Sequence, residues 1–147
     1  MKPLNNSFNV NFNSAELFAQ SLGGKVEGNF IIVPESINRG IMYYLNCAPG
    51  INALYVDAEY DQDVLFREEV IEDSYIGIYF NLTKGEADFG FKNSSHPIGN
   101  WHYDLIVLDS AVKSDYLIKK GTKSSALNIF IKKDVDGSDC ESICEFT

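Results

Sequence analysis

The side chains best suited to hold a small molecule lie in the segment 75–82, where polar and aromatic residues alternate with purely apolar ones. Successive side chains of a β-strand point to opposite faces. Tyr75, Tyr79 and Asn81 therefore share one face, and Gly77 leaves room between the two rings. Binding pockets are mostly apolar and aromatic with a few polar groups, and phenol and amide side chains supply both.

A second pair of the same kind lies earlier in the chain, where Tyr44 and Asn46 are two residues apart and share a strand face. Periodicity leaves two arrangements open. If these faces point inward, Tyr75 and Tyr79 stack on or hydrogen-bond to a ligand, and Asn81, Tyr44 and Asn46 serve as polar anchors. If they point outward, they form a half-wetted surface of the sheet.

Metal-ligand patterns are absent from the sequence. His96 and His102 are the two histidines, a loop with Pro and Gly separates them, and no His-x-His pair occurs. We expect His96 to be a solvated loop residue and His102 a strand residue with an ordinary hydrogen bond. Cys140 and Cys144 have helical spacing, but a thiolate site needs further ligands that are not nearby. The sequence therefore predicts no metal and no cofactor.

Catalytic motifs are missing too. No Gly-x-Ser-x-Gly elbow occurs, and Gly23-Gly24 ends a predicted helix where a phosphate loop would precede one. Glu68 and Glu69 are adjacent carboxylates, but neighbouring strand residues point to opposite faces. We therefore expect no enzymatic activity.

The elements that must position these side chains are mostly strands. Pro49-Gly50 has type II turn chemistry and predicts a hairpin of 39–47 with 51–58. About nine strands, with turn signals roughly every ten residues, indicate an antiparallel sandwich or barrel. The longest predicted loop is 92–100, and the remaining predicted strands are 8–12, 26–33, 64–71, 75–82, 101–108, 114–119 and 125–131. A turn at 84–86 leads into the segment 87–91.

One short amphipathic helix is predicted over 14–22. Asn13 or Ser14 is the expected N-cap, and Asn13 with Glu16 has capping-box spacing. Gly23-Gly24 provides the stop signal. We expect its apolar residues to cover the core: Leu17, Phe18 and Leu22.

Length and charge limit the classes of function. A chain of 147 residues predicts one domain, assigned here to 1–133, followed by an acidic tail at 134–147 that is either frayed or a short helix. The net charge of −9, without a cluster of Lys and Arg, argues against nucleic-acid binding by this chain. No apolar run reaches the roughly 20 residues that a membrane span needs. Three cysteines and no secretory signal favour a cytoplasmic location.

Over roughly residues 8–133 the chain resembles the N-terminal domain of AraC-type transcription regulators. The segments that carry the resemblance are LGGKVEGNFIIVP at 22–34, GIMYYL at 40–45, YIGIYFNL at 75–82, YLIKKGTK at 116–123 and LNIFIKK at 127–133. The resemblance implies an all-β, cupin-like jelly-roll barrel with one or two short helices, which senses a small-molecule effector and often forms a homodimer. It also favours the inward arrangement of the Tyr75–Tyr79 face, because sugar-sensing relatives use that strand for the effector.

Two helix-turn-helix units normally follow the barrel in that family and bind DNA. Only fourteen residues follow Lys133, too few for one such unit. We therefore expect DNA binding only through a C-terminal part that this chain lacks.

Two alternatives stay open. A cupin-like isomerase or lyase working without metal would need acidic or histidine side chains gathered in the barrel mouth, such as Glu68, Asp88 or His102. A dimerising scaffold would have a filled interior, and the helix at 14–22 could then belong to a partner surface.

Overall fold

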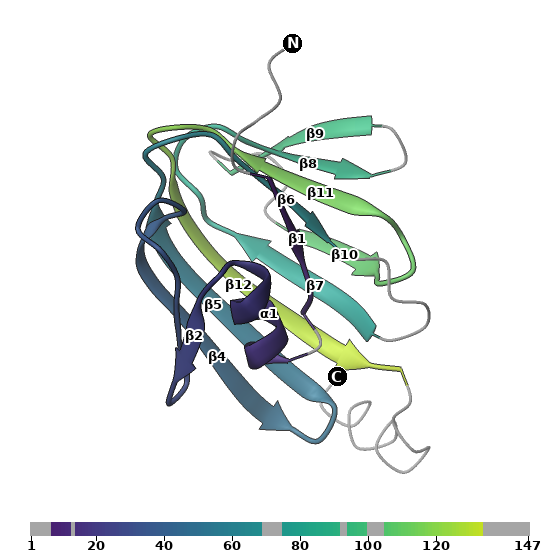
Figure 1. Ribbon diagram of the computed structural model, residues 1–147. Helices are drawn as coiled ribbons and strands as arrows, with labels where there is room; N and C mark the ends of the chain where they lie inside the picture. Colours follow the sequence, from purple (N-terminus) through teal and green to yellow (C-terminus); the bar gives the residue numbers. More distant parts are fainter. Residues whose placement is uncertain (1–6, 13, 69–74, 92–93, 100–104, 134–147) are drawn as a thin grey trace.

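Two β-sheets face each other and enclose the core (Figure 1). The computed structural model describes residues 7–12, 14–68, 75–91, 94–99 and 105–133. The smaller sheet has five strands in the order β1 (Ser7–Val10), β6 (Val64–Glu68), β11 (Ser114–Ile118), β8 (Ala87–Phe91) and β9 (Ser94–Ile98). The larger has seven, in the order β10 (Leu105–Asp109), β7 (Tyr75–Asn81), β12 (Lys123–Lys132), β5 (Ile51–Glu59), β4 (Arg39–Ala48), β3 (Phe30–Ile32) and β2 (Lys25–Glu27).

Alternation along β7 decides which side of the larger sheet is buried. Tyr75 and Asn81 are 3% and 6% exposed, whereas Ile76 and Phe80 are 37% and 42% exposed. The tyrosine face therefore points into the space between the sheets, and the aliphatic face is the outer one. Strands of both sheets contribute large apolar side chains to the same space. They are Leu54, Val56 and Phe130 from the larger sheet and Val64, Phe66 and Phe89 from the smaller one.

The outer face of the larger sheet carries a continuous apolar row. Strand register places Leu105 beside Phe80, Phe80 beside Leu127, and Leu127 beside Tyr55. The row continues from Tyr55 through Tyr43 to Phe30, so it crosses six strands. Six strands spaced about 4.8 Å apart give a width of about 24 Å. We call these six residues the outer row.

The helix α1 (Ala15–Ser21) lies beside β2 and β1, at the edge where the two sheets separate (Figure 1). Ser14 caps it, since its Oγ accepts a hydrogen bond from the backbone N–H of Leu17 at 3.1 Å. Phe18 stacks on Phe12, which stacks on Phe130 of β12. The helix is thus a cover on the core, as predicted, but Leu17 is 42% exposed and does not belong to its buried face.

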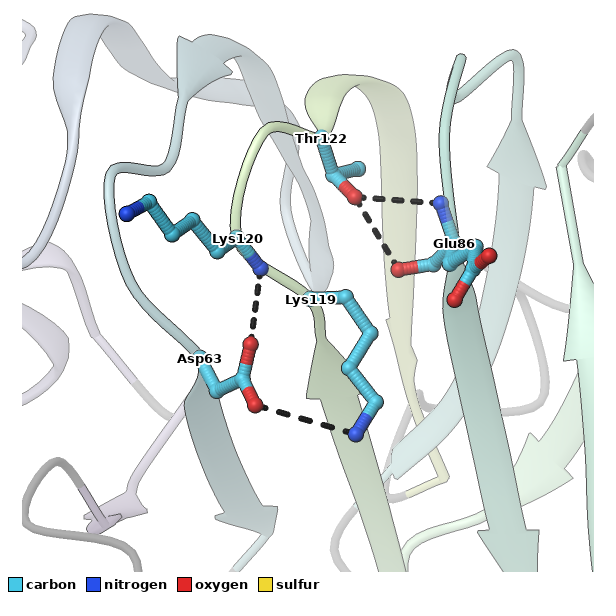
Figure 2. Close-up of polar contacts among 5 residues, drawn as sticks. All are labelled: Asp63, Glu86, Lys119, Lys120 and Thr122. Atoms are coloured by element: carbon cyan, nitrogen blue, oxygen red, sulfur yellow. Dashed lines mark hydrogen bonds and ion pairs between the residues drawn. The ribbon is translucent and has the colours of Figure 1, made fainter.

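Polar contacts join three loops at one end of the two sheets (Figure 2). The carboxylate of Asp63 accepts a hydrogen bond from the backbone N–H of Lys120 and lies 3.7 Å from Nζ of Lys119. Oγ1 of Thr122 accepts from the backbone N–H of Glu86 and donates to its carbonyl oxygen. These contacts fix the loops that precede β6, β8 and β12, so we call this end the closed end. Tyr75 and Glu68 lie at the opposite ends of their strands.

The predicted hairpin is confirmed, with Asn46 paired to Asn52 and Gly50 at φ 76°. Three strand predictions are wrong in detail. The segment 26–33 is a small hairpin of β2 and β3, because Gly28 (φ 60°) and Asn29 turn the chain. The predicted loop 92–100 contains β9, which pairs with β8. The sheet is not wholly antiparallel either, since β1 pairs with β6 in parallel.

The remaining boundaries agree within a few residues where they can be compared. The predicted strand ends at 69–71 and 101–104, the residue Asn13 and the tail 134–147 lie outside the described residues. The single helix of the described ranges, α1, has seven residues and is too short to cross a membrane.

Candidate functional site

A cavity of about 90 Å³ lies between the two sheets. Its wall is mostly aromatic and aliphatic, with side chains from both sheets, from Phe12 and from α1. Tyr79 and Asn81 of β7 belong to this wall, as do the polar residues Glu68, Ser114, Tyr116, Ser124 and Asn128. A mainly apolar wall with a few polar groups is the composition of a small-molecule site.

The charged centre of the cavity is Glu68. It is the last residue of β6, on the same face as buried Val64 and Phe66, so alternation turns its side chain inward. Its Oε1 accepts a 2.6 Å hydrogen bond from the hydroxyl of Tyr75, and its Oε2 accepts a 2.7 Å bond from Oγ of Ser114. Tyr79 also donates to this carboxylate, at 3.1 and 3.2 Å. Hydroxyl-to-carboxylate bonds of this length are charge-assisted and strong.

The ring of Tyr79 reaches Glu68 because Gly77 has no side chain. A Cβ at Gly77 would lie 2.5 Å from the hydroxyl oxygen of Tyr79 and 2.7 Å from two ring carbons. Burial and the nearby carboxylate of Glu68 raise the pKa of Tyr79 well above its usual value of 10. The phenol therefore stays protonated at neutral pH and acts as a donor.

A second polar group lies further toward the closed end. Nδ2 of Asn81 donates to the hydroxyl of Tyr116 at 3.0 Å, and Oδ1 of Asn81 accepts from the backbone N–H of Thr83 at 2.9 Å. Burial raises the pKa of Tyr116 above 10. Asn81 is thus held in place at both ends of its amide and presents a fixed polar edge to the cavity.

Tyr44 and Asn46 lie elsewhere. They line a groove of about 640 Å³ beside the start of α1, together with Glu16 and Asn52. Burial and the charge of Glu16 raise the pKa of Tyr44 to about 12. The hydroxyl of Tyr44 points toward the backbone oxygen of Phe12 at 3.4 Å. Neither residue belongs to the cavity wall.

The five residues singled out from the sequence are therefore divided among three places. Tyr79 and Asn81 line the cavity, and Tyr75 lies beside it as a hydrogen-bond donor to Glu68. Tyr44 and Asn46 lie in the groove, because they are at the far end of β4 near the hairpin turn. Whether these residues bind a ligand stays a prediction.

Sequence reasoning missed Glu68 as a partner of the tyrosines, together with Ser114, Tyr116 and Asn128. The available signal was a carboxylate in register with Val64 and Phe66, where alternation predicts an apolar residue. The same alternation along β11 puts Ser114 and Tyr116 on the face of buried Ile118.

Potential metal ligands are dispersed in the part of the chain that the structure describes. No group of three or more His, Cys, Asp or Glu side chains is close enough there to hold a metal ion. His96 is part of β9 and stacks on Phe91 with ring centroids 5.0 Å apart, so its assignment to a solvated loop is wrong. Asp88 lies on the face of β8 opposite inward Ala87 and Phe89. His102, Glu69, Cys140 and Cys144 lie outside the described residues.

The two sheets have the arrangement of a cupin barrel, which confirms the predicted fold class. KdgF from a Halomonas species is similar to this chain with a TM-score of 0.52 and 12% identity, over 74% of this chain and 89% of KdgF. A cupin protein from Bacteroides fragilis is similar with a TM-score of 0.51 and 13% identity, over 76% of this chain and 92% of that protein. No protein-family model and no curated protein matches the sequence. Sequence identity this low indicates a shared fold but says nothing about a shared activity. Nothing in these similarities points specifically to AraC-type regulators.

Proposed function

We propose that this chain is the effector-binding and dimerisation domain of an AraC-like transcription regulator. The observation that carries the proposal is the inward position of Tyr79 and Asn81, whose side chains line a cavity in a cupin barrel. A ligand there contacts β7 and β12, which are hydrogen-bonded neighbours along seven residue pairs. The outer face of the same two strands carries the outer row, so a ligand could change the population of a dimer through one sheet.

The outer row supports dimerisation, and we propose that a second copy of this chain covers it. Exposed apolar patches of more than a few hundred Å² on a protein usually mark an interface. A second row adjoins the first, with Val107 beside Ile78, Ile78 beside Ile129, and Leu45 on the same face. Two copies related by a twofold axis would each cover the other's rows, as an isologous interface requires.

A thermal-shift screen of small metabolites tests effector binding. An effector should raise the melting temperature, because a ligand that binds only the folded state stabilises it. Ala126→Leu places three more carbons in the cavity wall and should abolish the shift. Ala111→Leu makes the same change at an exposed position in the turn after β10, outside the cavity wall and both rows, and should preserve it. If no metabolite in a broad set raises the melting temperature, the sensor role is contradicted.

The second candidate is a cupin-like enzyme that works without metal, and the observation in its favour is the carboxylate of Glu68 among three hydroxyl groups. A carboxylate beside protonated phenols could move a proton to or from a bound substrate. Against it, Asp88 does not join Glu68 in the cavity. Turnover of a thermal-shift hit that stops in Glu68→Gln would favour the enzyme, whereas binding without turnover would favour the sensor.

A further inference from the structure

The carboxylate of Glu68 faces the cavity, and within the part of the chain that the structure describes no cation lies beside it. Three hydroxyl groups surround it, and none of the four ion pairs found among the described residues includes it. The described wall of the cavity contains no Lys, Arg or His. The second carboxylate of the described wall is that of Asp115, which is an exposed residue. Its Oδ1 lies over Gly90, on the face of β8 opposite Phe89 and Phe91. The described wall of the cavity therefore carries negative charge.

Aromatic rings form much of the remaining wall. Tyr79, Phe89 and Phe66 line the cavity from two sheets, and Phe12 and Phe18 line it from the helix side. The face of an aromatic ring attracts an organic cation, more strongly when water is excluded. A partly buried carboxylate and several rings around one space are complementary to a positively charged organic group, and they disfavour an anion.

The volume of the cavity limits the size of a ligand. A cavity of about 150 Å³ accommodates the six carbons of benzene. A cavity of about 90 Å³ therefore holds about four non-hydrogen atoms without expansion. Isopropylammonium has this size, and isopropanol and acetate match it as neutral and anionic compounds.

From these three observations we infer that the cavity binds a small organic ammonium group, with Glu68 as its counter-charge. The hydroxyl of Tyr79 is shared between both oxygens of Glu68 at 3.1 and 3.2 Å, so it is the donor that an ammonium N–H can displace most easily. The hydroxyls of Tyr75 and Ser114, at 2.6 and 2.7 Å, hold the carboxylate in position. The inference deepens the proposed function, on which it rests, by naming the chemical class of the effector or of the part of it that enters the cavity.

The test is a titration of the whole chain with isopropylammonium, isopropanol and acetate, followed by amide resonances in two-dimensional NMR spectra. We expect isopropylammonium to bind at least about tenfold more tightly than either matched compound, a ratio that corresponds to about 1.4 kcal/mol. The shifted resonances should belong to the strands that carry Glu68 and Tyr79, β6 and β7. Glu68→Gln keeps the shape of the side chain and should reduce the affinity for isopropylammonium about tenfold while leaving that for isopropanol unchanged.

Each result decides a separate question. If isopropanol or acetate shifts the wall resonances as strongly as isopropylammonium, the inference is overturned and the proposed cavity site stands. If none of the three compounds shifts them, the ammonium inference is overturned, and the metabolite screen with Ala126→Leu decides the proposed function by itself. The comparison of three ligands on the unaltered chain needs no variant, so it holds even if Glu68→Gln does not fold.

Discussion

The hydroxyl oxygen of Tyr79 lies 3.1 Å from Oε1 and 3.2 Å from Oε2 of Glu68, so one donor is shared by both oxygens of the carboxylate. Tyr75, four residues nearer the start of the strand on the same inward face, donates to Oε1 at 2.6 Å. The two tyrosines thus make unequal bonds to one carboxylate. This inequality distinguishes a structural hydroxyl from one that a ligand can displace.

Removing each hydroxyl in turn tests the inequality. We expect Tyr75→Phe to lower the free energy of unfolding by about 1–3 kcal/mol, because it removes a short bond to a charged group. Tyr79→Phe should lower it by less, since a shared proton makes a weaker bond. Urea unfolding followed by tryptophan and tyrosine fluorescence measures both. Tyr55→Phe, on the exposed outer face, is the matched control and should change the free energy by less than about 0.5 kcal/mol. A larger loss in Tyr79→Phe than in Tyr75→Phe would contradict this assignment.

Gly77 is the position that admits the ring of Tyr79. We expect Gly77→Ala to lower the free energy of unfolding by about 1–3 kcal/mol, because the new Cβ would lie 2.5 Å from the hydroxyl of a ring packed in the interior. Gly90→Ala is the matched control on the facing sheet. Its new Cβ would meet the flexible end of exposed Asp115, which can move into solvent at little cost.

A double-mutant cycle identifies the cause of the effect at Gly77. In a Tyr79→Ala background the ring is gone, so Gly77→Ala should cost at least about 1 kcal/mol less than in the unaltered chain. Chemical denaturation of the four proteins gives the coupling. If Gly77→Ala lowers the free energy of unfolding equally in both backgrounds, then backbone conformation, and not the ring of Tyr79, is the reason why position 77 requires glycine.

Alkaline pH should destabilise the barrel more steeply than it does an ordinary domain. Burial raises the pKa of several tyrosines above 10 in the folded state, so the folded protein keeps protons that the unfolded chain loses at pH 10. Their contribution to stability is complete below pH 10 and decreases as pH rises above it, by about 1.4 kcal/mol per pH unit for each tyrosine. Urea unfolding in a series of buffers from about pH 8 to pH 11 measures the slope. The tyrosines concerned are Tyr44, Tyr60, Tyr79 and Tyr116.

Tyr60→Phe supplies the control for this slope. It removes one fully buried phenol that accepts a hydrogen bond from Asn38, so it should reduce stability at neutral pH and also flatten the decline above pH 10 by one tyrosine's share. An unchanged slope in Tyr60→Phe, or a stability that does not vary up to pH 11, would be inconsistent with the raised pKa values.

Alternation was enough to predict the strands that matter most for the cavity. In β7 it separated Tyr75, Tyr79 and Asn81 from the apolar side chains. It did not show which of the two faces points into the core, because that depends on the face against which the second sheet packs. It failed for β9, whose Ser94, Ser95 and Pro97 carry loop signals, because pairing with β8 outweighs local propensity there. The parallel pairing of β1 with β6 joins segments more than fifty residues apart, and no local pattern reports such a contact.

The site was predictable only in part, for a related reason. Tyr79 and Glu68 meet across two sheets, so their contact depends on the distance between the sheets and on the missing side chain of Gly77. Tyr44 and Asn46 share one face of their strand, as predicted, but they lie at the end of this long strand that is far from the cavity. The two-residue period carries no information on position along the barrel axis. A carboxylate in an apolar register, as Glu68 is, was a second local signal that pointed to the cavity, besides the polar face of β7.

The outer row leads to the last prediction. Leu127 lies at its centre, between Phe80 on β7 and Tyr55 on β5, and is 40% exposed. If a second copy of the chain covers this face, Leu127→Lys buries an unpaired ammonium group in the interface and should shift the protein from dimer to monomer in sedimentation velocity at micromolar concentration. Leu17→Lys is the matched control, because Leu17 is 42% exposed on α1, away from the outer row, and should leave the dimer intact. A dimer that persists in Leu127→Lys and dissociates in Leu17→Lys would move the interface to the helix, and a monomeric unaltered chain would remove dimerisation from the proposed function.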